Sequence, residues 1–133
     1  MKINVWLLGV SVCLLFCRCA TESIGGATLE EIAREFNKKC PQMIDSETKI
    51  DGIEIKEPNT IIYNYTLVNI IKQRVDTVEF NKQLRPGLIS VIKLSPEMKK
   101  LRDINTNFEY AYYDKSHAFI YLFKISPLDY NSK

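Results

Sequence analysis

The order in which strand-like alternation and helix-like spacing of apolar residues follow one another along the chain most constrains the fold. The clearest strand lies at 61–68, a run rich in β-branched and aromatic residues. One set of side chains, Ile61, Tyr63, Tyr65 and Leu67, alternates with a second set, Ile62, Asn64, Thr66 and Val68. A weaker strand at 48–55 precedes it, and its interruption at Asp51-Gly52 predicts a bulge. Two further strands, at 108–113 and 118–125, flank a short turn and therefore predict a hairpin.

Each pair of strands follows a segment with helical signals. Residues 28–31 have the Thr-Leu-Glu-Glu pattern of a capping box, and apolar residues then recur at helical spacing until Pro41. A second helix is expected to begin after Asp76 and to break near Pro86-Gly87, with another short helical segment after the break.

This order of elements predicts a single α+β domain over residues 28–127, followed by a tail at 128–133. Two α-β-β units should give a four-stranded antiparallel sheet with helices packed mainly on one face. In the last strand both faces are apolar, so its second face should be covered within the domain or should meet a partner. The simpler interpretation is an internal strand that the monomer itself covers.

Residues 1–20 have the pattern of a bacterial export signal. Lys2 precedes an uncharged, mostly apolar run at 3–17, which is shorter than the ~20 residues that span a bilayer. A small, flexible spacer is expected at 21–27. The chain should therefore be exported, either as a membrane-anchored lipoprotein or as a periplasmic or secreted protein.

Cys17 is the predicted lipid attachment residue, because a lipoprotein carries its acyl chains on a cysteine directly after the apolar run. Leu14 fits the position three residues earlier, whereas Phe16 stands where a small residue is usual. Ordinary signal cleavage after Cys19 is the alternative. Acylation of Cys17 would anchor the protein to a membrane without a spanning segment.

Charge and residue content disfavour several function classes. The chain has 18 basic and 16 acidic residues, and removal of Lys2 and Arg18 leaves 16 of each, so a duplex nucleic-acid binder is not expected. No phosphate-binding glycine loop is recognised, since Gly25-Gly26 precedes every strand. The domain has one cysteine and one histidine, too few for a zinc site without several carboxylates. No cofactor and no metal are predicted.

The Cys40-Pro41 and Tyr63-Asn64-Tyr65-Thr66 motifs, together with Leu101-Arg102-Asp103, resemble those of a widespread family of small exported bacterial proteins, many of them lipoproteins. The resemblance covers roughly residues 29–125. It implies export and a single domain, and it implies no catalytic residue or ligand.

Four tyrosines on strands are the candidate recognition surface: Tyr63, Tyr65, Tyr110 and Tyr112. Tyrosine provides contact area at a low entropic cost, so a sheet face that carries several can bind a partner. The alternative is that these rings pack under the helices. Both interpretations stay open at this point.

The predicted function is a non-enzymatic binding module for another envelope protein or for a ligand, in an oligomeric state that the sequence leaves open. One alternative is a small inhibitor or immunity protein, by analogy of fold alone. Another is a thiol enzyme that uses Cys40 and His117. Because Cys40 ends an apolar helical stripe and is expected to pack as a small hydrophobic residue, no catalytic residue is assigned.

Overall fold

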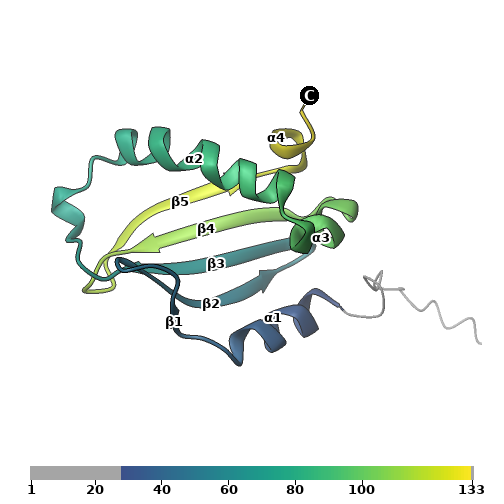
Figure 1. Cartoon of the computed structure of the whole chain (residues 1–133), viewed down its shortest axis with the longest axis horizontal. Coiled ribbons are helices and arrows are strands. Elements are labelled where there is room, and N and C mark those ends of the chain that lie inside the picture. The colour runs from purple at the N-terminus through teal and green to yellow at the C-terminus, as the bar shows by residue number, and fades with distance from the viewer. Residues whose placement is uncertain (1–27, 133) are drawn as a thin grey trace, which may run out of the picture.

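The computed structural model describes residues 28–132, which form a five-stranded sheet with four α-helices and two 3₁₀ turns (Figure 1). In chain order the elements are α1 (Leu29–Asn37), β1 (Gln42–Met43), β2 (Thr48–Lys56), β3 (Thr60–Leu67), the 3₁₀ turn η1 (Lys72–Arg74), α2 (Thr77–Leu94), the 3₁₀ turn η2 (Pro96–Met98), α3 (Lys99–Asp103), β4 (Asn107–Tyr113), β5 (Phe119–Ile125) and α4 (Pro127–Asn131). The expected signal, spacer and lipidated Cys17 lie outside the described residues.

The sheet is mixed, with the strand order β1-β2-β3-β4-β5. All neighbours are antiparallel except β3 and β4, which are parallel. The prediction of four antiparallel strands was therefore wrong in number and in direction. The chain crosses back through α2 between β3 and β4, so β4 starts at the same end of the sheet as β3. The two-residue β1 is too short to show any periodicity.

The α-helices pack on one face of the sheet, as predicted. Phe36 of α1 meets Tyr63 on β3, and Phe80 of α2 meets Tyr112 on β4. The two tyrosines share a face because Tyr63 pairs with Tyr110, two residues from Tyr112. The predicted bulge in β2 is also confirmed by a register shift between Ile50 and Gly52.

The capping box at the start of α1 is confirmed by two reciprocal hydrogen bonds. The Glu31 N–H donates to Thr28 Oγ1 at 3.2 Å, and the Thr28 N–H donates to Glu31 Oε2 at 3.0 Å. At the other end, the Asn37 amide accepts from the Ile53 N–H at 2.7 Å and donates to the Ile53 carbonyl at 2.8 Å. A Cβ atom on Gly52 would lie 3.0 Å from Asn37 Oδ1, so glycine permits this close approach.

α2 runs without interruption from Thr77 to Leu94, so the predicted break at Pro86-Gly87 was wrong. Asp76 caps the helix as expected, because its Oδ1 atom accepts from two backbone N–H groups at 2.9 and 3.1 Å. Pro86 is exposed, and so is Lys82 one turn earlier. The carbonyl that loses its donor at Pro86 therefore lies on the solvent side, where water can replace the missing bond.

The end of the chain also differs from expectation. Most of the segment expected as a tail forms α4, in which Tyr130 is 4% exposed and packs on Phe108 with ring centroids 5.7 Å apart. The Tyr130 hydroxyl donates to the Thr106 carbonyl at 2.9 Å. Asp129 forms an ion pair with Arg85 of α2 at 2.9 Å.

β5 lies at an edge of the sheet, so the interpretation of it as an internal strand was wrong. Ile120, Phe123 and Ile125 are nevertheless buried. The Arg85 guanidinium reaches past the strand from α2 and donates to the Lys124 carbonyl at 3.0 Å. This hydrogen bond occupies one backbone carbonyl of the edge strand.

Candidate binding site on the helix-covered face

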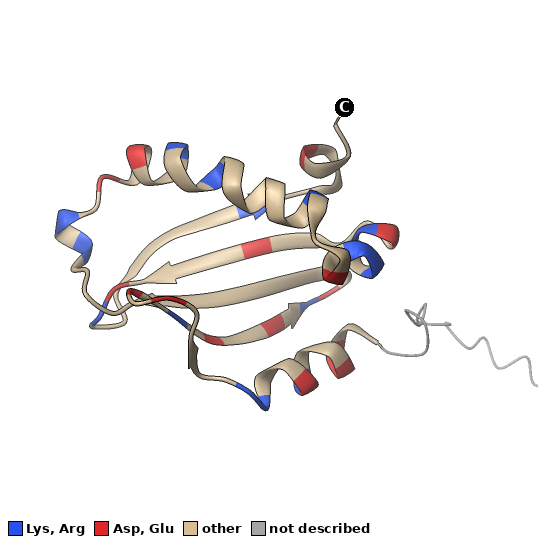
Figure 2. Cartoon of the chain, in the orientation of Figure 1, with Lys and Arg blue, Asp and Glu red and all other residues tan. Residues whose placement is uncertain are grey.

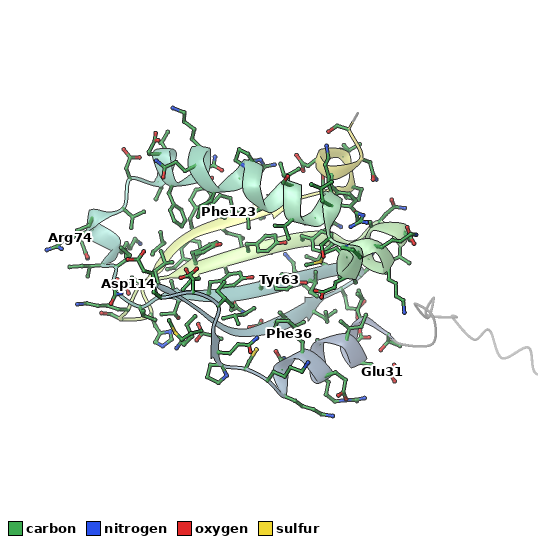
Figure 3. The ribbon with its side chains drawn as sticks, viewed as in Figure 1. Glu31, Phe36, Tyr63, Arg74, Asp114 and Phe123 are labelled. Atoms are coloured by element: carbon green, nitrogen blue, oxygen red, sulfur yellow. The ribbon has the colours of Figure 1, made fainter. Side chains whose placement is uncertain are left out.

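Six aromatic rings form a continuous row across the sheet from α1 to α2, here called the aromatic row. Neighbouring ring centroids lie 5.1 to 6.5 Å apart, with four stacked tyrosines in the middle and a phenylalanine edge-on at each end. The members are Phe36, Tyr63, Tyr65, Tyr110, Tyr112 and Phe80. Figure 3 shows Phe36 beside Tyr63, between α1 and β3.

The four tyrosines of the predicted recognition surface are brought together in this row, but most of their surface is covered. Tyr63 and Tyr112 are each 7% exposed and Tyr110 is 3% exposed, whereas Tyr65 stays partly exposed. Packing under the helices thus accounts for three of the four rings. Only Tyr65 offers ring surface to a partner without rearrangement.

Burial keeps the phenol groups protonated. It raises the pKa of Tyr63 and of Tyr112 to about 12. Burial, followed by the neighbouring phenols, also raises the pKa of Tyr65 and of Tyr110 above the ordinary range. The phenols stay protonated at neutral pH, as ordinary tyrosines do, and the Tyr63 hydroxyl donates to Met98 Sδ at 3.9 Å.

Two open hollows lie at the ends of the aromatic row. The hollow on α1 has a volume of about 590 Å³ and includes Ile32 and Phe36. The hollow at the start of α2 has a volume of about 250 Å³ and includes Leu67, Val75 and Phe80. Phe36 and Phe80 therefore belong both to the row and to a hollow, whereas none of the four tyrosines lines either hollow.

α1 and α2 lie too far apart to pack on each other. α1 packs on β2 and α2 packs on β5, at opposite sides of the sheet (Figure 1). Three strand spacings of ~4.8 Å separate these positions by roughly 14 Å, whereas packed helices lie about 8–10 Å apart. The interval is not open along its whole length, because Tyr63 and Tyr110 on the same two strands are 7% and 3% exposed and only Tyr65 stays partly exposed.

The apolar side of α2 continues beyond the part that is buried. Five residues share this side because they follow one another at intervals of four, three, four and three: Phe80, Leu84, Gly87, Val91 and Leu94. Phe80 and Leu84 pack on the core, whereas Val91 is 53% and Leu94 is 77% exposed. Sequence reasoning missed this stripe, here called the α2 stripe, because Pro86-Gly87 was taken as the end of the helix.

Charges of both signs surround this site. The hollow on α1 includes Glu31 and Glu35 together with Arg34 and Lys39. Figure 2 shows that α1 is mainly acidic with basic residues at its end, whereas α2 has an acidic residue at its start and basic residues after it.

The structure does not bring Cys40 and His117 together. Cys40 packs against the core on the helix-covered face, and its thiol donates to the Phe36 carbonyl at 3.7 Å. Burial, and then the nearby Asp51, raise the pKa of this thiol, which lowers its reactivity at neutral pH. His117 lies in the turn after β4 and lines a hollow of about 400 Å³ with Asn64 and Tyr113, on the opposite face of the sheet. A thiol and imidazole dyad has no geometric basis here.

Within residues 28–132, none of the helices is long and apolar enough to cross a bilayer. Within the same residues, no group of three or more histidine, cysteine, aspartate or glutamate side chains is placed to hold a metal ion.

Residues 25–122 match the family described as a domain of unknown function, DUF8479. The chain belongs to this family. No curated protein matches it.

Three solved structures are similar in fold. A Pseudomonas aeruginosa protein named for its expected secretion has a TM-score of 0.63 and 15% identity over 75% of this chain and 87% of the other. The pilotin EpsS of the Vibrio vulnificus type 2 secretion system has a TM-score of 0.61 and 11% identity, over 77% and 87% of the two chains. The type II secretion system pilotin AspS of Vibrio cholerae has a TM-score of 0.55 and 9% identity, over 74% and 84%. At such identities, the likeness establishes a shared fold alone.

Proposed function

We propose that this DUF8479 chain is an exported, non-enzymatic binding module of the bacterial envelope that holds an apolar segment of another envelope protein across the aromatic row. The observation that carries this proposal is the α2 stripe, which leaves Val91 and Leu94 exposed on the side of the helix that also carries Phe80. Exposed apolar surface next to partly exposed aromatic rings is typical of a protein-binding site.

Two further observations support an exported role. Residues 1–20 have the pattern of an export signal, and a lipid on Cys17 would tether the domain through the spacer at 21–27. Two of the three similar structures are pilotins of type 2 secretion systems, and the third protein is named for its expected secretion.

The test compares one leucine and one valine of equal exposure on the same helix. Leu94 and Val78 are both 77% exposed, but Val78 lies on the other side of α2 from the stripe. Full-length chains with Leu94→Glu or Val78→Glu would be expressed in the native envelope and crosslinked, and the captured proteins identified. We expect a specific partner that is captured by the wild type and by Val78→Glu, and lost with Leu94→Glu. Equal capture by both variants, or equal loss, would contradict the proposal.

A further inference from the structure

We propose that the hollow lined by His117, on the face of the sheet opposite the helices, binds a sugar ring. This site goes beyond the proposed function, because none of the residues that line it belongs to the aromatic row or to the α2 stripe.

The hollow, here called the His117 hollow, lies at the bulge of β2. Its volume of about 400 Å³ is within the range of small-molecule sites. The fold brings together side chains from the end of α1, from β2, from β3, and from β4 with the turn that follows it. The polar members are Asn37, Asp51, Glu54, Asn64, Tyr113 and His117.

Several of the polar groups in the hollow are held in place by neighbouring side chains. The Asp51 carboxylate accepts from Thr66 Oγ1 at 2.5 Å and pairs with Lys49 Nζ at 2.8 Å. On the next strand, Asn64 Nδ2 donates to Glu54 Oε1 at 2.9 Å. Each carboxylate has further acceptor lone pairs, and the amide has a carbonyl oxygen and a second N–H. The hollow thus presents donors and acceptors at fixed positions, as recognition of a ring with several hydroxyl groups requires.

An aromatic ring adjoins these polar groups. Tyr113 is half-buried and lines the hollow, and Phe119 packs edge-on against it, with ring centroids 5.9 Å apart at 71°. Phe119 is itself 47% exposed, so this pair of rings forms part of the surface. An aromatic ring offers flat apolar contact area, on which the C–H face of a sugar can pack while its hydroxyls reach the polar groups.

The backbone at His117 gives a second reason to assign a role to its side chain. His117 has a φ of 61°, a conformation that glycine adopts without steric cost. The turn itself is fixed by the Asp114 carboxylate, which accepts from the Ser116 N–H at 2.7 Å and the Ala118 N–H at 2.9 Å. Glycine would therefore suit the turn better, whereas histidine places an imidazole, with its donor and acceptor nitrogens, at the hollow.

Other classes of ligand fit this hollow less well. Asp51 and Glu54 would repel a phosphate or a carboxylate. A fully apolar ligand would cover these carboxylates without giving them hydrogen bonds. A metal ion is disfavoured because the described residues place no three histidine, cysteine, aspartate or glutamate side chains together, and Lys49 already neutralises Asp51. A neutral ligand rich in hydroxyl groups avoids all of these costs.

The experiment titrates the full chain with sugars and measures binding by calorimetry, in a detergent without a sugar headgroup. Chitotriose and maltotriose are the sugar probes, and putrescine and inorganic phosphate are the amine and anion probes. We expect at least one of the sugars to bind with about millimolar affinity, and the amine and the anion not to bind. Tyr113→Leu, which removes the ring and keeps apolar volume, should weaken sugar binding about tenfold. Leu94→Glu, at the other proposed site, should leave sugar binding unchanged.

Two variants with matched backbone conformations provide the sharpest comparison. His117→Gly should not lower the thermal midpoint, because glycine adopts this φ readily, and yet it should weaken sugar binding about tenfold, the order of one hydrogen bond. Asn105 has a φ of 54° and does not line the hollow, so Asn105→Gly is the control and should leave binding unchanged.

Three results would overturn the inference: no binding of either sugar, binding of putrescine or phosphate alone, or sugar binding that His117→Gly leaves intact. A large fall in the thermal midpoint with His117→Gly would also overturn it, because the imidazole would then serve the fold. Since Leu94→Glu and His117→Gly affect different faces, failure of this site and failure of the proposed function are measured separately.

Discussion

At the scale of single residues, buried Asp114 joins two loops. It is 2% exposed, and its carboxylate accepts from the Lys72 N–H at 3.0 Å, the Ser116 N–H at 2.7 Å and the Ala118 N–H at 2.9 Å. The hydrogen bond from Lys72 is the largest cause of the lowered pKa of Asp114. Residue Lys72 lies 42 positions earlier in the chain, so the sequence favours a turn role for Asp114 but cannot reveal this contact.

This lowered pKa predicts a loss of stability in acid. Since the carboxyl has a lower pKa in the folded chain, its contribution is complete above the unfolded-state pKa and is lost as pH falls through the folded-state pKa. We expect Asp114→Asn to lower the urea midpoint at pH 7 and to have less effect at pH 2. Asp103→Asn, at an exposed ion pair with Lys99, is the control and should have little effect at pH 7. A deficit that persists unchanged in acid would contradict this account.

Phe36 allows a quantitative prediction at the α1 end of the aromatic row. Its ring is half-buried and meets Tyr63 edge-on at 6.2 Å. Full burial would give a loss of ~3–5 kcal/mol on Phe→Ala, so we expect Phe36→Ala to cost about 2–3 kcal/mol. Phe36→Leu should cost less, because it retains most of the apolar volume. Denaturant titration measures both, and a change below ~1 kcal/mol for Phe36→Ala would show that the ring contributes little.

At the scale of elements, local signals predicted most of the boundaries. The caps at Thr28 and Asp76 depend on residues a few positions away, and both are confirmed. The break at Pro86-Gly87 also follows from local propensity, yet the apolar spacing from Phe80 to Leu94 continues through it. Leu84, Leu88 and Ile92 pack on the core on either side of Pro86-Gly87, and this packing outweighs the unfavourable propensity of two residues. The candidate site was missed for the same reason.

Gly87 therefore lies inside α2, at a position where nothing in the structure requires a glycine. An added Cβ atom would have no neighbour within 4 Å, so Gly87→Ala should stabilise the protein by about 0.5–1 kcal/mol. Gly52→Ala is the opposite control, because its Cβ atom would lie 3.0 Å from Asn37 Oδ1 and should weaken the contact between α1 and β2. Thermal unfolding compares the two, and a lower midpoint for Gly87→Ala would refute the prediction.

At the scale of the whole molecule, strand positions were predictable but their pairing was not. Runs of β-branched and aromatic residues mark β3, β4 and β5, although β4 is buried on both faces from Phe108 to Tyr112. Whether β4 runs parallel or antiparallel to β3 depends on how α2 crosses the sheet. The residues of β3 and β4 themselves do not indicate that crossing. The tyrosines could likewise be assigned to strands, whereas their coverage depends on where the helices pack.

Attachment to the membrane is a further prediction at this scale. Because the basic and acidic residues after the signal are balanced in number, acyl chains on Cys17 would be the main attachment. We expect the native protein to label with fatty acid and to enter a detergent phase. Cys17→Ser should abolish both properties, and Cys13→Ser should not. A mature N-terminus at Ala20 or later would instead assign the protein to a soluble exported pool.

The parallel pairing of β3 with β4 also determines the order in which the chain can finish folding. Residues before α2 form one antiparallel unit, β1-β2-β3, and residues after it form another, β4-β5. The two units meet along a single seam, from Thr60 paired with Asn107 to Thr66 paired with Tyr113. Closing that seam brings together segments separated by more than forty residues, which is slow compared with forming a hairpin. The tyrosine stack spans this seam, so the aromatic row is complete only when the last of the two halves has folded.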